Sequence, residues 1–201
     1  MTSQSEMAGD VDGALRYAYE RLTHELDARF EYHNIFHTFE DVMPAALHLA
    51  DAYDIAAEKR DLLRVGVAFH DLGLCEGAES HEQRGVEHAR LILPAFGFSP
   101  ADIEVIAGLI LATRLPQSPT NLLEEIIADA DLDVLGRDDF LTRNDILFRE
   151  TANNGDGQTK RDWLAKQIAF LRNHRYFTQA ARDRRDAGKR RNLAALLDQV
   201  V

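Results

Sequence analysis

Residues 62–71 read LLRVGVAFHD, an apolar run that ends on a histidine and an aspartate. Its apolar residues recur at helical spacing, which predicts a central, buried helix that ends near His70. A neutral imidazole and an ionised carboxylate are costly in such a place unless they are paired or bind a cation. The pair His70 and Asp71 is therefore a candidate metal site. The competing interpretation is a core histidine whose hydrogen bonds are satisfied by its neighbours.

Two further stretches carry histidines or acids in a suggestive arrangement. Upstream, YHNIFH at residues 32–37 places His33 and His37 four positions apart, so that a helix there would present both imidazoles on one face. Such a pair also arises by chance in many soluble helices. Downstream, IIADADLDVL at residues 126–135 again delivers acids directly after an apolar helix, and at least one of them is expected only to solvate a helix end. These acids are Asp129, Asp131 and Asp133.

Helical spacing recurs through the rest of the chain, and strand-like alternation is almost absent. We therefore predict an all-α protein of about eight or nine helices joined by short polar turns. Ser80 followed by Gln83 fits a capping box at the start of one helix. Ser99 before Pro100 starts the next, and Thr159 is a candidate N-cap for a later helix.

The composition fits a single domain of 201 residues, with residues 1–10 as a flexible N-terminus and residues 11–201 folded. No apolar run reaches the roughly 18 to 20 residues that cross a bilayer, so no membrane association is expected. The single cysteine, Cys75, forms no intramolecular disulfide, which favours the cytoplasm. A net charge of -11 repels a phosphate backbone, so duplex nucleic acid is not an expected partner. The oligomeric state is not indicated.

Taken in order, YHNIFH, AFHDLG and DADL resemble the HD-domain superfamily of metal-dependent phosphohydrolases, and more distantly the cyclic nucleotide phosphodiesterases. The resemblance covers residues 33–139 and implies a single compact HD-type helical domain. It also implies that His37, His70 and Asp71 bind a metal. The fourth ligand is Asp131 if the Asp-Leu pattern is matched. It is Asp129 if the match is anchored on Ala-Asp after an apolar run.

The resemblance further implies that His33 is the proton donor beside the metal, and we count His33 and Asp71 as the catalytic residues. A mixed nitrogen and oxygen site suits Mn, Fe, Ni or Zn, and Mg less well. Such an ion lowers the pKa of bound water from about 15.7 toward 7, so that metal-bound hydroxide can attack phosphorus. Members that bind two metals carry additional histidines, where this chain has LILATR at residues 109–114. One metal is therefore expected.

Two residues are candidates for substrate binding. His81 lies at the first turn of a predicted helix, where an anion is favoured, although an ordinary surface histidine is an equal alternative. Arg114 could clamp a phosphate or cap a helix. The predicted function is hydrolysis of a phosphoester of a nucleotide or a related small molecule. The alternative is a non-catalytic HD module that senses a nucleotide, which would have no need of the proton donor His33.

Overall fold

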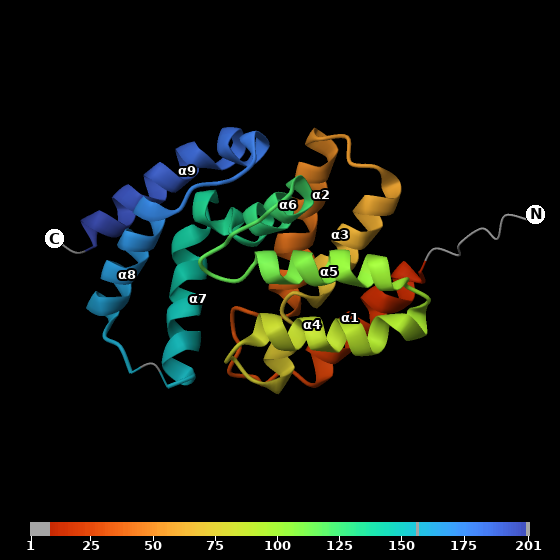
Figure 1. The fold of residues 1–201 in the computed structure, drawn as a ribbon. Helices are drawn as coiled ribbons and strands as arrows, with labels where there is room; N and C mark the ends of the chain where they lie inside the picture. The colour runs from red at the N-terminus through yellow and green to blue at the C-terminus, as the bar shows by residue number, and fades with distance from the viewer. Residues whose placement is uncertain (1–8, 156, 200–201) are drawn as a thin grey trace, which may run out of the picture.

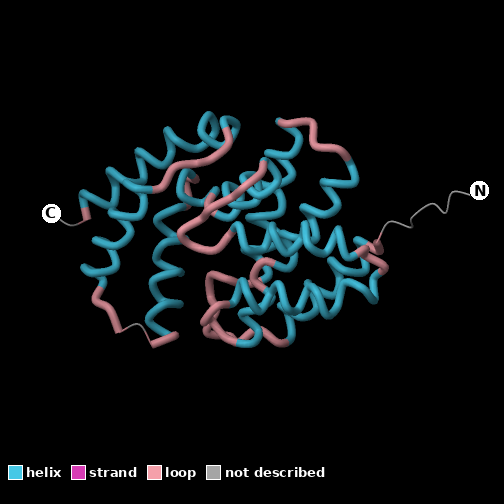
Figure 2. The backbone as a smooth tube through the Cα atoms, viewed as in Figure 1, coloured by secondary structure: helices cyan, strands magenta, loops and turns pink. Residues whose placement is uncertain are grey.

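The computed structural model describes residues 9–155 and 157–199, and within those residues the chain is helical, with nine α-helices and no strand (Figures 1 and 2). This confirms the all-α prediction. Residues 1–8 of the predicted flexible N-terminus lie outside the described residues. The α-helices are α1 (Val11–His24), α2 (Met43–Ala52), α3 (Ala57–Phe69), α4 (His81–Ile92), α5 (Pro100–Ala112), α6 (Leu122–Asp131), α7 (Phe140–Asn153), α8 (Lys160–Asn173) and α9 (Gln179–Asp198). A π-helical turn, η1 (His37–Val42), and three 3-10 turns, η2 (Leu72–Glu76), η3 (Leu93–Phe96) and η4 (Asp133–Gly136), complete the described helical segments.

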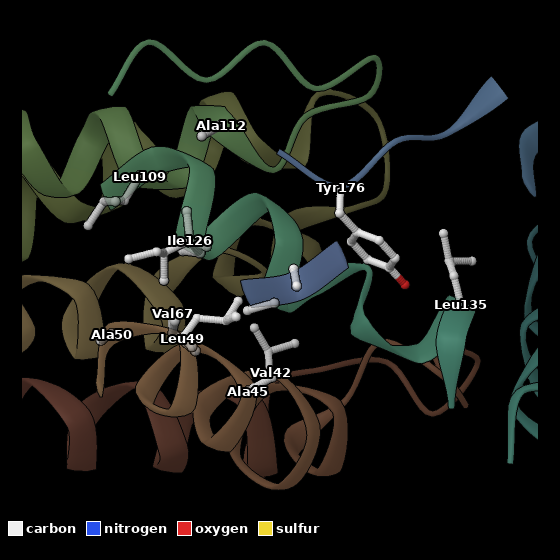
Figure 3. Close-up of a cluster of buried hydrophobic side chains, with 14 of the residues drawn as sticks. Val42, Ala45, Leu49, Ala50, Val67, Leu109, Ala112, Ile126, Leu135 and Tyr176 are labelled. Atoms are coloured by element: carbon white, nitrogen blue, oxygen red, sulfur yellow. The ribbon is translucent and has the colours of Figure 1, made fainter. Parts of the chain in front are cut away.

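Helix α3 is the buried helix that the run LLRVGVAFHD predicts. Its residues Leu63 and Val67 pack with α2, α5 and α6, in a cluster that Figure 3 shows around Leu49, Leu109 and Ile126. Its other faces pack against α1, α4 and α5 in a second apolar cluster. Because α3 is shared by both clusters, its C-terminal end is fixed deep in the molecule.

The local capping signals are partly right. Ser99 and Thr159 each form a capping box, with Asp102 and Asp162 respectively. The capping box predicted at Ser80 is wrong. Ser80 precedes α4 in a left-handed conformation (φ 52°, ψ 38°), and its side chain makes no capping hydrogen bond. A capping side chain reaches the first turn from an extended backbone, which Ser80 does not have.

The C-terminal helices α7, α8 and α9 lie beside the rest of the molecule (Figure 1). Helix α9 is anchored on η4, where Arg185 makes two 2.6 Å hydrogen bonds to the carboxylate of Asp133. The third acid of the ADADLD segment is thus used in an ion pair. Among the described residues, no helix combines the length and apolarity needed to cross a bilayer. The cytoplasmic location stays a prediction.

Candidate metal centre

His70 and Asp71 stand where α3 ends. The Nδ1 of His70 donates to the carbonyl oxygen of Val67 at 2.7 Å, which directs Nε2 away from the helix. A metal-binding histidine commonly donates its other ring N–H to a backbone carbonyl in this way. The backbone at Asp71 (φ -103°, ψ 1°) leaves the α-helical conformation, and its carboxylate lies beside the imidazole, with Oδ2 3.1 Å from Nε2.

His37 and Asp131 join this pair from two other elements. His37 begins η1, and its Nε2 lies 3.2 Å from Oδ1 of Asp131 at the end of α6. The same oxygen of Asp131 is 3.6 Å from Nε2 of His70. Ligand atoms of His37, His70 and Asp131 all lie within 4.8 Å of one another, a spacing that one ion can bridge. Asp71 Oδ2 adds a fourth candidate ligand atom, 3.8 Å from His37 Nε2.

The donor set fits a divalent transition ion. His37, His70 and Asp71 are only 2%, 1% and 2% exposed. Within the described part of the chain, Nε2 of His70 and Oδ2 of Asp71 are buried without a hydrogen-bond partner. Such atoms cost about 1–3 kcal/mol each, which a bound cation would offset. Two imidazole nitrogens and two carboxylates suit Mn, Fe, Ni or Zn.

The electrostatics of the cluster agree with that fit. Burial alone would raise the pKa of Asp71 and Asp131, but the neighbouring imidazoles outweigh it, and both pKa values are lowered. Burial would lower the pKa of His70, yet the negative charges of Asp71 and Asp131 beside its Nε2 raise that pKa well above its ordinary value. The carboxylates are therefore ionised, and the proton that His70 holds beside them is one that a bound cation would displace.

Asp129 points elsewhere. Its carboxylate is buried and accepts hydrogen bonds from the backbone N–H groups of Phe177 and Thr178, both at 2.8 Å, and from the Thr178 hydroxyl at 2.7 Å. These bonds fix the start of α9. The structure thus places Asp131 in the cluster, whereas Asp129 binds the segment that begins α9. The role of Asp131 as fourth ligand stays a prediction.

His33 lies beside the cluster, although not for the reason its spacing suggested. Residues 31–34 form bends rather than a helix, so the helical arrangement that would have put both histidines on one face is not present there. The two rings nevertheless approach to 5.5 Å between centroids, because the chain turns directly into η1. Burial disfavours the charged form of His33, but a hydrogen bond to Glu150 and the charge of Asp71 outweigh it and raise its pKa.

Glu150, on α7, is a residue that sequence reasoning missed. It is buried, and its Oε1 accepts a short hydrogen bond from Nδ1 of His33. Its Oε2 accepts from the backbone N–H groups of Tyr32 and His33 at 2.7 and 3.0 Å. Nothing in the local sequence distinguishes Glu150 from an ordinary helix-surface acid. Only the tertiary fold shows that it holds His33.

His33, His37, Asp71 and Asp131 line one end of a cavity of about 300 Å³. His81 lines it too, with Nε2 3.6 Å from Oδ1 of Asp71, as a substrate-binding role would require. Arg114 is exposed and is absent from the residues that line the cavity, so the geometry lends no support to the predicted phosphate contact. Both roles stay predictions. The arginine that does line the cavity is Arg143, which the sequence analysis did not select.

Neither family models nor curated proteins give a match. Among solved structures, the chain is similar to the crystal structure of a predicted HD superfamily hydrolase from an uncultured Thermotogales bacterium. The two have a TM-score of 0.59 and 20% sequence identity, over 98% of this chain and 92% of that chain. At this identity the likeness shows the fold. The protein therefore has the HD-type fold that its motifs predicted. Its cluster of His37, His70 and Asp131 could hold a metal ion.

Proposed function

We propose that the protein is a metal-dependent phosphohydrolase that cleaves a phosphoester of a nucleotide or a related small molecule. The observation that carries this proposal is the convergence of His37, His70, Asp71 and Asp131 at one end of a cavity that His33 also lines. The described neighbour is named a predicted hydrolase, which agrees with this class of reaction.

In this proposal His37, His70, Asp71 and Asp131 hold one divalent ion of Mn, Fe, Ni or Zn. When bound, the ion supplies Lewis acidity, which lowers the pKa of coordinated water and offsets negative charge on phosphoryl oxygens. The imidazoles of His37 and His70 bind as neutral donors, and the two carboxylates neutralise the charge of the ion.

His33 is suited to proton donation. Its Nδ1 is occupied by Glu150, which leaves Nε2 to carry a proton toward the cavity. A group with this placement can protonate the leaving oxygen of a phosphoester. His81, at the N-terminus of α4, would meet a phosphoryl oxygen on the opposite side of Asp71.

The second candidate function is the non-catalytic nucleotide-sensing module. The observation that favours catalysis over nucleotide sensing is the hydrogen bond between His33 and the buried carboxylate of Glu150. Holding a histidine in one orientation and raising its pKa serves proton transfer, whereas binding alone needs neither.

The test begins with elemental analysis of protein purified without chelator. We expect close to one transition metal per chain. Chelated protein should regain thermal stability with Mn, Fe, Ni or Zn more than with Mg, and should then cleave members of a phosphoester panel. Absence of metal, with no stabilisation by any of these ions, would remove the central claim. Metal without cleavage, together with nucleotide binding, would favour the sensing module.

A further inference from the structure

The cavity has two chemically different ends. One end holds the candidate metal centre with His33 and His81. The other is walled by residues of α7, α8 and the segment around η4. Helices α7 and α8 lie next to one another in Figure 1, and α7 contacts η4. Six side chains that make this second wall apolar are Leu132, Val134, Phe140, Leu147, Trp163 and Phe170.

Positive charge is scarce in this cavity. Among the described residues that line it, Arg143 is the only arginine or lysine. Its guanidinium is already engaged, since Nη2 lies 2.8 Å from Oδ2 of Asp41 and the group sits 4.6 Å from the centre of the Tyr32 ring. Asp41 also pairs with Arg137, so it offsets only part of the charge of Arg143. Three carboxylates, those of Asp71, Glu82 and Asp131, line the same space.

This balance limits how many phosphates a ligand can carry. One phosphoryl group would lie at the metal end, where the ion offsets its charge. A second or third phosphate would meet apolar side chains or carboxylates. Sites that bind polyphosphates supply free arginines, lysines or additional metal ions for each group, because a desolvated anion without a partner is very costly. Among the described residues of α7 and α8 that line the cavity, the paired Arg143 is the only arginine or lysine.

The same wall is suited to an uncharged group. The volume of the whole cavity, about 300 Å³, is at the low end of small-molecule sites, which span roughly 300–1,000 Å³. Polar side chains are few there. Thr151 donates its hydroxyl to the carbonyl of Phe148, whereas the buried Oδ1 of Asn144 has no hydrogen-bond partner within the described part of the chain. Two amides, Asn144 and Gln167, line the cavity, and the unpartnered oxygen of Asn144 is the one suited to orient a mostly apolar ligand.

We propose that the substrate carries a single phosphoryl group on an uncharged, predominantly apolar alcohol that packs against α7 and α8, and that nucleoside polyphosphates are excluded. This inference rests on the proposed function and narrows its substrate class. Beyond the metal centre, it follows from the apolar wall residues and from the ion pair that already engages Arg143.

The first experiment compares alkyl phosphoesters with similar leaving groups on the metal-loaded protein. The pair is phenethyl phosphate and glycerol phosphate, each as monoester and as methyl diester, with adenosine triphosphate as the polyphosphate. We expect kcat/KM for the cleaved phenethyl ester to exceed that of its glyceryl partner by about 10-fold or more, as apolar pockets discriminate on this scale. The triphosphate should not be cleaved. Equal or reversed preference, or efficient cleavage of the triphosphate, overturns this inference and leaves the hydrolase proposal intact.

A general activity control separates the two claims. If para-nitrophenyl phosphate and every other ester resist cleavage, the hydrolase proposal fails. Calorimetric binding then decides the inference by itself, since phenethylphosphonate should bind the metal-loaded protein about 10-fold or more tightly than inorganic phosphate does. Equal binding overturns it.

A matched pair of variants tests whether α7 is responsible for the preference for the phenethyl ester. Leu147→Lys places a cation in the apolar wall and should reduce the preference for the phenethyl ester by about 10-fold. Ile146→Lys adds the same charge one residue away, outside the cavity lining, and should leave the preference unchanged. Leu147→Asn serves if the lysine variant does not fold. An unchanged preference in both Leu147 variants would show that α7 does not contact the substrate.

Discussion

The carboxylate of Glu150 binds both the imidazole and the backbone N–H of His33, although 117 positions separate the two residues. One carboxylate oxygen accepts from the imidazole, and the other accepts from the N–H groups of Tyr32 and His33. This contact ties the segment that precedes η1 to helix α7. It also places a buried negative charge behind the histidine that we propose as proton donor.

We expect Glu150→Gln to act on catalysis through His33. The amide keeps the shape and one acceptor for the backbone, but it does not stabilise a protonated imidazole as a carboxylate does. Metal content should stay near that of the wild type, while kcat for an alkyl phosphoester should fall about 10-fold to 100-fold. Hydrolysis of a nitrophenyl ester, which needs little protonation, should fall much less. Metal analysis and both assays are made on one preparation.

The comparison variant is His33→Ala, which removes the proton donor itself and should cost about 100-fold to 10,000-fold on the alkyl ester. Combining it with Glu150→Gln should add little, because residues in one hydrogen-bonded unit are not additive. Glu104→Gln, at an exposed ion pair with Arg90, is the control for a lost charge. Equal losses on both esters in Glu150→Gln would reduce Glu150 to a structural role.

Substitutions of the two acids on α6, Asp131 and Asp129, should have different effects. Asp131→Asn is expected to lose metal, because Oδ1 of Asp131 is the oxygen that faces both His37 and His70. Asp129→Asn should keep metal but lower the free energy of unfolding by about 1–3 kcal/mol, because an amide N–H would face donors from Phe177 and Thr178. Metal content per folded chain and chemical denaturation measure the two effects. The reverse pattern would transfer the ligand role to Asp129.

How far the sequence predicts this molecule depends on how local each feature is. Helix α3 and its burial follow from the spacing of apolar residues in LLRVGVAFHD, and the caps at Ser99 and Thr159 follow from contacts over three positions. The Ser80 cap failed because the backbone there is set by the packing of η2 against α4, which no local pattern reports.

The candidate site is likewise divided into features that local sequence predicts and features that only tertiary packing produces. The order of the His and Asp motifs predicted which histidines and acids might meet, and the structure brings His37, His70 and Asp131 together. Glu150 and Arg143 could not be found in this way. They lie among other polar residues in RNDILFRE, at residues 143–150, and act only because α7 packs across the cavity.

Close packing beneath the site gives a further prediction. A Cβ atom at Gly73 would overlap the carbonyl oxygen of His81, so Gly73→Ala must displace the start of α4. That displacement would move His81 away from Asp71, which its Nε2 now approaches to 3.6 Å. We expect the free energy of unfolding to fall by about 1–3 kcal/mol and metal to bind more weakly. Denaturation curves and metal titration check both.

Gly108→Ala is the matched control. Gly108 lies inside α5, and a Cβ there would meet only the flexible end of Glu124, at 3.0 Å. Alanine is favoured over glycine in a helix by about 0.5–1 kcal/mol, so this variant should be neutral or slightly more stable. Were Gly73→Ala equally well tolerated, the contact between η2 and α4 would be softer than the structure indicates.

The last prediction concerns pH and a histidine remote from the metal centre. His174 follows α8, where its Nδ1 lies 3.2 Å from Nζ of Lys189 and its ring packs edge-on against Tyr176. Burial, with the charge of Lys189, lowers the pKa of His174 from 6.5 to about 4. Asp186 opposes the shift and Arg175 adds to it. The native protein therefore keeps this imidazole neutral.

Between those two pKa values the unfolded chain binds a proton that the native chain does not bind, so acid favours unfolding. The contribution of His174 to stability is complete above 6.5 and is lost as the pH falls toward 4. From about pH 7 to about pH 5 the loss is at most about 2 kcal/mol. His174→Gln should remove this part of the pH dependence of urea denaturation. The exposed His48 on α2 provides the control His48→Gln, which should retain the wild-type dependence. An identical pH dependence in His174→Gln and the wild type would mean that native His174 accepts a proton as readily as the unfolded chain does.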